Sequence, residues 1–153
     1  MPAPSSPPRY WLLNFRPDTY EIVKAAGVIG VLDSHRRRFA SLGPGDRFVV
    51  YVSQRRIFDA HGRIESEPFT DLTPIFGPKR LYPWRCKVSF EQTGGAIPGD
   101  DLLWDLTAWP DPMKTTPSNY LFCYGGFLEM PEADYQAVRR VLAESVTASI
   151  PGR

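Results

Sequence analysis

The chain has 153 residues, of which 42% are hydrophobic and 23% are charged. These values describe one ordinary globular domain that can bury a core without stabilising disulfides or metals, and they exclude collagen, coiled coil and whole-chain disorder. Sixteen prolines and twelve glycines predict short elements joined by many turns, which excludes a long helical bundle. The net charge of +1 provides no overall attraction to nucleic acids or membranes.

The ends of the chain differ from its middle in composition. The first nine residues are rich in proline and serine. We therefore expect a disordered arm over 1–9, a folded domain over 10–148 and a flexible tail over 149–153. The sequence contains no signal-peptide pattern and no apolar run of membrane-spanning length. Cys86 and Cys123 lie in apolar runs without close spacing. This pattern predicts free thiols in a cytoplasmic protein, with a single disulfide as the alternative.

Short elements are predicted in chain order. A strand at 10–13 ends at Asn14, Pro17 begins a helix that Gly27 ends, and Asp33 or Ser34 caps a second short helix. The remaining predicted elements are strands at 47–53, 57–64, 84–90 and 120–124, loops at 67–83 and 92–119, and a C-terminal helix at 131–145. Together they predict a small α+β domain around a curled sheet or partial barrel, with a concave mouth suited to ligands.

Recognisable signatures of catalysis are missing from the sequence. There is no P-loop, no GxGxxG, no GxSxG and no HExxH. Histidine and cysteine side chains can bind zinc, and the chain contains four of them: His35, His61, Cys86 and Cys123. Their spacing is not that of a zinc site, so we predict no metal and no cofactor. Asp59 and His61 suggest an acid–base pair, but two residues that share one face of a strand are the simpler interpretation. We predict a non-catalytic protein.

Positive charge is concentrated in one segment. The segment from Ser34 to Arg63 contains seven arginines and two aspartates, so its net charge is +5 and that of the rest of the chain is −4. Arginines beside aromatic strands are suited to neutralising phosphates while rings stack on bases. The candidate phosphate-binding residues are Arg36, Arg37, Arg38, Arg55 and Arg56. The alternative is a solvated surface held by weak ion pairs.

Seven segments of the chain follow one another in a characteristic order. They are Tyr10-Trp11-Leu12-Leu13, Gly27-Val28-Ile29-Gly30-Val31, Gly43 to Tyr51, Glu67-Pro68-Phe69, Thr73-Pro74-Ile75-Phe76, Tyr82 to Val88, and Gly126-Phe127-Leu128-Glu129-Met130 before an acidic helix. Together they resemble an EVE domain over roughly residues 10–145. The resemblance implies a PUA-like pseudo-β-barrel of about five to six strands, flanked by short helices and a C-terminal helix. Related YTH and SRA domains hold one modified base in an aromatic-walled pocket. The resemblance therefore implies a domain that recognises a modified, for example methylated, base in DNA or RNA, alone or with an effector nuclease or other protein in trans.

The resemblance also implies where the pocket lies. The family builds it from the segment after the first strand, here Asn14 and Phe15, and from the Gly-x-x-Gly segment, here Val28, Ile29 and Gly30. The amide of Asn14 is suited to reading a base edge, with a cap or turn role as the alternative. Relatives often carry tryptophan where this chain has Ile29. The missing ring is expected from Trp104 or Trp109 in the long loop, or from Tyr51 or Trp84, for which a core role is the alternative.

Two other classes of function remain open. The related ASCH domains suggest a small-molecule-binding protein or hydrolase on the same fold, in which a lysine or an acid pair inside the cavity acts and polymer length has no effect on binding. A protein-interaction module is the other class, and it would bind neither oligonucleotides nor nucleosides.

Overall fold

The structure is a computed structural model that describes residues 7–32, 35–77, 82–99, 102, 105–106 and 127–149, with side chains described as far as 145. The first elements are strand β1 (Tyr10–Phe15), helix α1 (Pro17–Ala26), strand β2 (Val28–Val31) and helix α2 (Arg36–Phe39). Six further strands follow, β3 (Arg47–Val52), β4 (Ile57–Ile64), β5 (Phe69–Thr70), β6 (Trp84–Gln92), β7 (Ile97–Pro98) and β8 (Phe127–Met130), before helix α5 (Glu132–Ser149).

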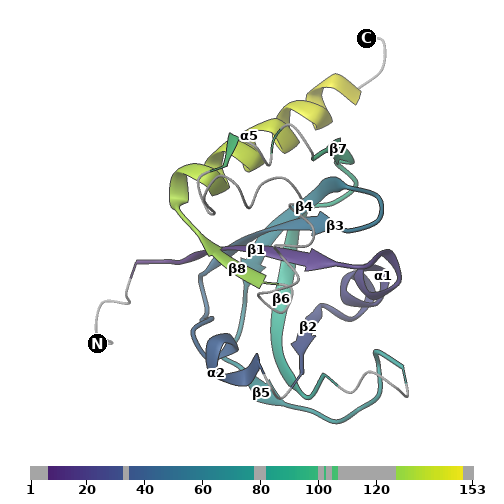
Figure 1. The fold of residues 1–153 in the computed structure, drawn as a ribbon, viewed down its shortest axis with the longest axis vertical. Coiled ribbons are helices and arrows are strands. Elements are labelled where there is room, and N and C mark those ends of the chain that lie inside the picture. The colour runs from purple at the N-terminus through teal and green to yellow at the C-terminus, as the bar shows by residue number, and fades with distance from the viewer. Residues whose placement is uncertain are drawn as a thin grey trace.

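One curled sheet organises the domain (Figure 1). Its strand order is β2-β6-β4-β3-β1-β8, with β5 paired to β6 and β7 paired to β4. The β1–β3 pair is parallel, and the other pairs are antiparallel. The mixed sheet with short helices and a C-terminal helix confirms the predicted α+β class and the partial barrel. The ends of this path are β2 and β8, so the sheet curls without pairing these two strands.

Apolar side chains pack on both faces of the sheet. Alternate residues of β1 point to opposite sides, so that Trp11 and Leu13 enter one core and Leu12 enters the other. The first core lies inside the curl, beneath α1 and α2. The second lies beneath α5, whose stripe of Tyr135 and Leu142 is fully buried as predicted. In Figure 1 this helix crosses above β1, β3 and β4.

Two buried carboxylates tie loops to the sheet. Asp46 accepts hydrogen bonds from the indole N–H of Trp11 at 3.0 Å and from the amide of Gly43 at 3.1 Å. Asp59 accepts from the hydroxyl of Tyr20 at 2.6 Å and from the amide of Gly94 at 3.1 Å. Charge-assisted hydrogen bonds of this kind offset the desolvation of a buried carboxylate. Asp59 thereby joins α1 to the strand that carries it.

Most predicted elements match observed ones. Strand β4 has the predicted bounds, β6 extends two residues beyond its prediction, and α1 ends at Gly27, which takes a left-handed conformation at φ 68°. Strand β2 was not predicted as a strand. The strand predicted at 120–124 lies outside the described residues, as do parts of the predicted arm and tail. Within the described part of the chain, no helix has the length and apolarity needed to cross a membrane.

Candidate functional site

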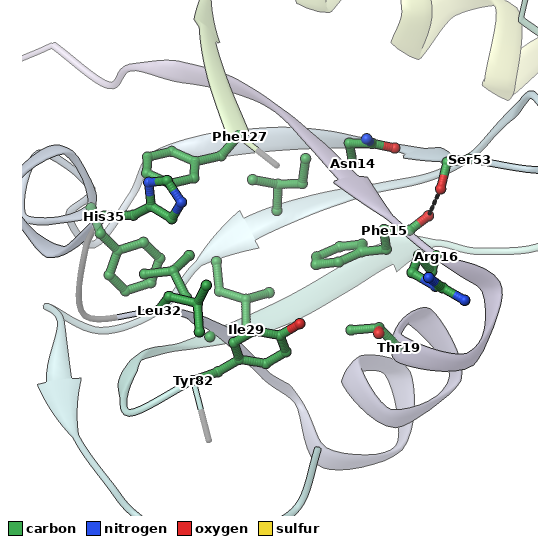
Figure 2. A pocket seen from close by; sticks show the side chains of 14 residues that line it. Asn14, Phe15, Arg16, Thr19, Ile29, Leu32, His35, Ser53, Tyr82 and Phe127 are labelled. Atoms are coloured by element: carbon green, nitrogen blue, oxygen red, sulfur yellow. Dashed lines mark hydrogen bonds between the residues drawn. The ribbon is translucent and has the colours of Figure 1, made fainter. Parts of the chain in front are cut away.

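A cavity of about 260 Å³ lies at the seam of the curled sheet, between β1 and the edge strand β2 (Figure 2). Helices α1 and α2 border it at either end through Thr19 and Phe39. The lining residues come from five parts of the chain: Leu13, Asn14, Phe15, Arg16, Thr19, Ile29, Gly30, Val31, Leu32, His35, Phe39, Ser53, Tyr82 and Phe127. Strands β1 and β2 are not paired with each other, which leaves room for a ligand between them.

Aromatic rings form much of the cavity wall. Figure 2 shows the ring of Phe15 pointing into the cavity, with Tyr82 on one side and Phe127 at the far end. Ile29 and Leu32 complete the apolar surface between them. Flat rings with aliphatic neighbours are suited to holding a planar apolar group by stacking and dispersion.

The Phe15 wall is supported from behind by Tyr20. The two rings are stacked with centroids 6.2 Å apart and an angle of 7° between their planes. The Tyr20 hydroxyl donates to Asp59 at 2.6 Å, and burial together with this carboxylate raises the pKa of Tyr20 above its ordinary value of 10. A neutral, hydrogen-bonded phenol with a fixed ring therefore holds Phe15 in place.

The Tyr82 wall depends on a glycine and on a buried arginine. A Cβ at Gly30 would lie 3.0 Å from Cβ and the carbonyl oxygen of Tyr82 and from a ring carbon of Phe76, so glycine permits the close approach. Arg85, which is 1% exposed, donates from Nε to the carbonyl of Tyr82 at 3.0 Å and from its terminal nitrogen to the carbonyl of Thr73. Arg85 thus fastens the segment that carries Tyr82 onto β6.

The described polar groups at the cavity include main-chain groups, three hydroxyls and the side chains of Arg16 and His35. Because the amide of Val88 donates to the carbonyl of Gly27, the antiparallel register turns the N–H and C=O of Gly30 away from β6, toward the open edge of β2. Figure 2 shows the hydroxyl of Tyr82 directed toward the side of the cavity where Thr19 lies. The hydroxyl of Ser53 donates to the carbonyl of Phe15 at 3.2 Å. A ligand edge at β2 therefore meets a donor and an acceptor next to each other.

Asn14 borders the cavity, but its amide lies elsewhere. The side chain points away from the cavity in Figure 2. Strand alternation requires this, since Leu12 and Tyr51, the register partner of Asn14, belong to the core beneath α5. The amide oxygen of Asn14 is buried without a hydrogen-bond partner. We predicted that this amide reads a base edge, but in the structure it does not point into the cavity.

The other predicted pocket residues divide into three groups. Phe15, Ile29 and Gly30 line the cavity, whereas Val28 is half-buried beside it. Tyr51 is fully buried on the opposite face of the sheet, packed on Phe58 with centroids 5.3 Å apart, which is the core alternative. Trp84 is half-buried against the first core, so its core alternative also holds. The predictions for Trp104 and Trp109 lie outside the described residues.

The predicted phosphate-binding arginines form two separate groups. The α2 group follows His35 at the cavity rim, and the other occupies the turn between β3 and β4; Figure 1 shows these segments on opposite sides of β1. The guanidinium of Arg36 lies 5.6 Å from the ring centroid of Trp84, and that of Arg38 donates to the carbonyl of Phe127 at 2.6 Å. Arg37 is exposed on α2. None of these arginines is among the described lining residues, but Arg38 of the α2 group contacts the lining residue Phe127.

Several lining residues were not predicted as site residues. They are Arg16, Thr19, Val31, Leu32, His35, Phe39, Ser53, Tyr82 and Phe127, with Leu13 from the first strand. Tyr82 and Phe127 occur in segments that resemble the EVE family, so that resemblance contained a usable signal for both. Thr19, His35 and Ser53 carry no such signal, because the positions of α1 and α2 and the pairing of β1 with β3 bring them together.

The residues considered for catalysis and metal binding lie apart: Asp59, His61 and Cys86 are buried, His35 lines the cavity, and Cys123 lies outside the described residues. Asp59 accepts hydrogen bonds from Tyr20 and from loop amides, and Nδ1 of His61 lies 3.5 Å from Glu91. Burial raises the pKa of the Cys86 thiol to about 12, which makes it a poor nucleophile. Among the described side chains, no group of three His, Cys, Asp or Glu residues is arranged to hold a metal ion.

Comparison with known proteins places this arrangement among known folds. No family model matches the chain. It is 28% identical over 149 residues to a UPF0310 protein of Pyrococcus horikoshii, a match that covers 87% of this chain and 98% of that protein. A solved structure of a hypothetical protein from Leishmania major superposes with a TM-score of 0.65 at 15% identity, covering 92% of this chain and 98% of the other.

A YTH domain is also among the similar structures. The YTH domain of a Zygosaccharomyces rouxii protein, solved in complex with N6-methyladenosine RNA, superposes with a TM-score of 0.63 at 16% identity. The match covers 88% of this chain and 86% of that domain. The chain therefore has a PUA-like fold related to that of YTH domains, as the resemblance implied.

Proposed function

We propose that this chain is a non-catalytic, EVE-type domain that holds one modified base of a nucleic acid in the cavity between β1 and β2. The observation that carries the proposal is an aromatic-walled cavity of about 260 Å³ at the open seam of a PUA-like sheet. Pockets for drug-sized ligands measure roughly 300–1,000 Å³, so this cavity suits a smaller planar group.

The walls are suited to a base that has left its stack. A base extruded from a strand needs flat apolar faces on which to stack, and Phe15, Tyr82 and Phe127 offer them. A methyl group that is fully buried against Ile29 or Leu32 adds about 0.8 kcal/mol, or roughly a fourfold gain in affinity. Recognition of a modification therefore depends on close contact with these side chains.

In this proposal, main-chain groups form the hydrogen bonds to the edge of the base. The outward N–H and C=O of Gly30 match the neighbouring acceptor and donor that base edges present. The α2 arginines lie beside the rim, where the flanking phosphates of an extruded nucleotide pass, and Arg37 is exposed there. Base and backbone thus have separate contact groups.

The comparisons support this proposal through the fold. The Zygosaccharomyces rouxii YTH domain was solved with N6-methyladenosine RNA, and its fold is the one found here. Whether this chain takes a DNA or an RNA base is decided by the experiment below. The proposal includes a cytoplasmic location and action alone or with an effector, such as a nuclease, supplied in trans.

A direct test measures fluorescence anisotropy of labelled single-stranded DNA and RNA. Each oligonucleotide carries one central base, either unmodified or as N6-methyladenine, 5-methylcytosine or N4-methylcytosine. We expect one modified base to bind at least about fourfold tighter than its unmodified parent. The Phe15→Ala variant should weaken this binding about tenfold, because it removes a stacking surface.

The matched control is Tyr51→Phe, which changes an aromatic residue on the opposite face of the sheet. It should bind like the unaltered protein. Salt-sensitive binding without any preference among bases would refute a base reader and leave only the α2 arginines. Equal binding of a free modified nucleoside and the oligonucleotide would instead favour the small-molecule alternative, although the described cavity lining offers neither a lysine nor a carboxylate for it.

A further inference from the structure

A basic side chain contacts one cavity-lining ring directly, and two others contact rings that pack against the remaining walls. The guanidinium carbon of Arg38 lies 4.4 Å from the ring centroid of Phe127, over the face of that ring. Lys24 lies 4.4 Å from the ring centroid of Tyr20, which stacks on Phe15. Phe127 is therefore polarised directly by a cation of the protein, and Phe15 through its neighbour Tyr20.

The third wall repeats the arrangement. The Arg85 guanidinium lies 5.3 Å from the ring centroid of Phe76, and Phe76 meets Tyr82 edge to face with centroids 5.2 Å apart. Arg85 is almost completely buried and also donates to the Tyr82 carbonyl, so its charge is held close to the wall. Three separate elements thus each contribute a cation: α2 to a wall ring itself, and α1 and β6 to a ring that packs against a wall.

Carboxylates offset part of this positive charge. Glu21 lies 2.9 Å from Lys24, and Asp71 lies 3.6 Å from Arg85; the side chains of both acids are at least 43% exposed and therefore well solvated. The buried carboxylate of Asp59 accepts from the Tyr20 hydroxyl and offsets Lys24 at that ring. Arg38 acts on its ring without an intervening residue and donates to a main-chain carbonyl. We expect Arg38 to have the largest influence on the cavity.

These contacts bear on the charge of the ligand. A ring attracts a cation through its electron-rich faces, and a cation on one face opposes a second cation on the other. The opposition is strong at an apolar site, where like charges are screened less than in water. The same rings lose nothing for a neutral base, which they hold by stacking and dispersion.

We propose that the cavity selects neutral modified bases and rejects bases that methylation of a ring nitrogen has made cationic. This inference rests on the proposed function and specifies the class of base. The phosphates of the same nucleotide remain attracted by the arginines at the rim, so the site distinguishes a neutral base from a cationic base on an identical anionic backbone.

Isomeric bases provide the test. N6-methyladenine and 1-methyladenine have the same atoms, but only the second is cationic at neutral pH, and 5-methylcytosine and 3-methylcytosine form a second such pair. Labelled single-stranded oligonucleotides that differ in this one base are titrated by fluorescence anisotropy. We expect the neutral isomer of the recognised pair to bind at least about tenfold tighter than the cationic one.

Variants separate charge from shape. Arg38→Gln keeps a hydrogen-bond donor for the Phe127 carbonyl but removes the charge, and it should reduce the preference for the neutral isomer at least about threefold. A second variant, Lys24→Gln on α1, should reduce the preference for the neutral isomer less. Arg140→Gln removes an exposed charge from α5, on the opposite side of the sheet, and should leave the ratio unchanged. Thermal melts identify any variant that does not fold.

The outcomes distinguish the two proposals. Equal or tighter binding of the cationic isomer by the unaltered protein would overturn this inference while the base reader stands. An unchanged ratio in both Arg38→Gln and Lys24→Gln would also overturn it, because the preference would then not come from the cations on these rings. Failure of both isomers to bind better than the unmodified base would overturn the proposed function itself, and this inference with it.

Discussion

The two faces of strand β1 have similar composition and different packing. Beneath α5, Leu12 and its neighbours from β3 and β4 form a closed core in which Tyr51 and Phe58 are fully buried. On the other face, the same strand ends at Phe15, which is only half-buried beside a cavity. Both faces are rich in aromatic residues. Aromatic content therefore did not distinguish core from binding site, whereas the unfilled volume does.

The covering elements account for the difference. Helix α5 has 18 residues and presents a continuous stripe to the sheet, so it fills the space beneath it. The other face is covered by α1 with 10 residues and α2 with 4, which stand apart at either end of the seam. Two short helices cannot fill the groove between β1 and β2, and a ligand-sized space remains. Four measurements test this comparison.

The largest effect is expected on the closed face. Leu142→Ala removes a completely buried side chain from beneath α5. Because a well-packed core collapses only partly around a deletion, we expect a loss of about 3 kcal/mol in the free energy of unfolding. Urea denaturation measures the loss, and base binding by the folded fraction should be unchanged. A loss below about 1 kcal/mol would mean that the face beneath α5 is not closed.

The matching deletion on the open face should cost less. Ile29 is 3% exposed but borders the cavity, so Ile29→Ala enlarges an existing space instead of creating a sealed one. We expect a loss of about 2 kcal/mol in unfolding free energy together with weaker base binding. The same urea denaturation and anisotropy titration apply. Equal losses for Ile29→Ala and Leu142→Ala would remove the distinction between the two faces.

Gly30→Ala alters the wall without deleting any atom. The added Cβ would crowd Phe76 and Tyr82 at 3.0 Å, and the Tyr82 wall must shift by a few tenths of an ångström. Overpacking of this kind costs about 1 kcal/mol. Base binding should fall several-fold, because Tyr82 is displaced from the cavity. Unchanged affinity in this variant would show that the position of Tyr82 does not matter for binding.

The smallest expected effect is a dependence of the protein's stability on pH, through a residue on the closed face. Burial lowers the pKa of His61 below its ordinary value of 6.5, although Glu91 opposes this shift and Arg139 of α5 adds to it. The fold therefore favours the neutral imidazole, and the stability that depends on it is present above about pH 6.5 and declines as the pH falls toward the lowered pKa.

Thermal melts at about pH 7.5 and about pH 5.5 measure this decline. We expect the melting temperature of the unaltered protein to fall by about 2 °C between them and that of His61→Gln to fall less. The carboxylates of Glu65 and Asp71 have lowered pKa values and stay ionised across this range, so they do not contribute. An identical decline in both proteins would exclude His61 as the source.

Local patterns in the sequence predicted most of the secondary structure. Pro17 and Gly27 bound α1, alternation identified β6, and the apolar spacing of Tyr135, Val138 and Leu142 identified the buried stripe of α5. These features depend on neighbouring residues alone, because capping, alternation and helical periodicity are properties of a short segment. Strands β2, β5, β7 and β8 were not predicted, and β5 and β7 lie within the predicted loops 67–83 and 92–119. These strands have only two to four residues, and β2 contains a glycine, so their local signal is weak.

The candidate site was predicted in part. The resemblance identified Phe15, Ile29 and Gly30, which line the cavity, but the side chain of Asn14 and the ring of Tyr51 belong to the opposite face. Strand alternation already places Asn14 and Phe15 on opposite sides, so that one of these two side chains had to point away from any shared pocket. Thr19, His35 and Ser53 were missed, because they come together only through helix packing and the pairing of β1 with β3.

The sequence by itself determined the class of the domain, the bounds of most elements and the concentration of arginine between 34 and 63, because these follow from composition and from short-range periodicity. Only the tertiary structure decided which rings form a wall and which form a core. It also decided that basic side chains from α1, α2 and β6 lie on Phe127 or on rings that pack against the other walls. The physical reason is that a cavity is the volume left unfilled by elements distant in sequence, and no single segment encodes that volume.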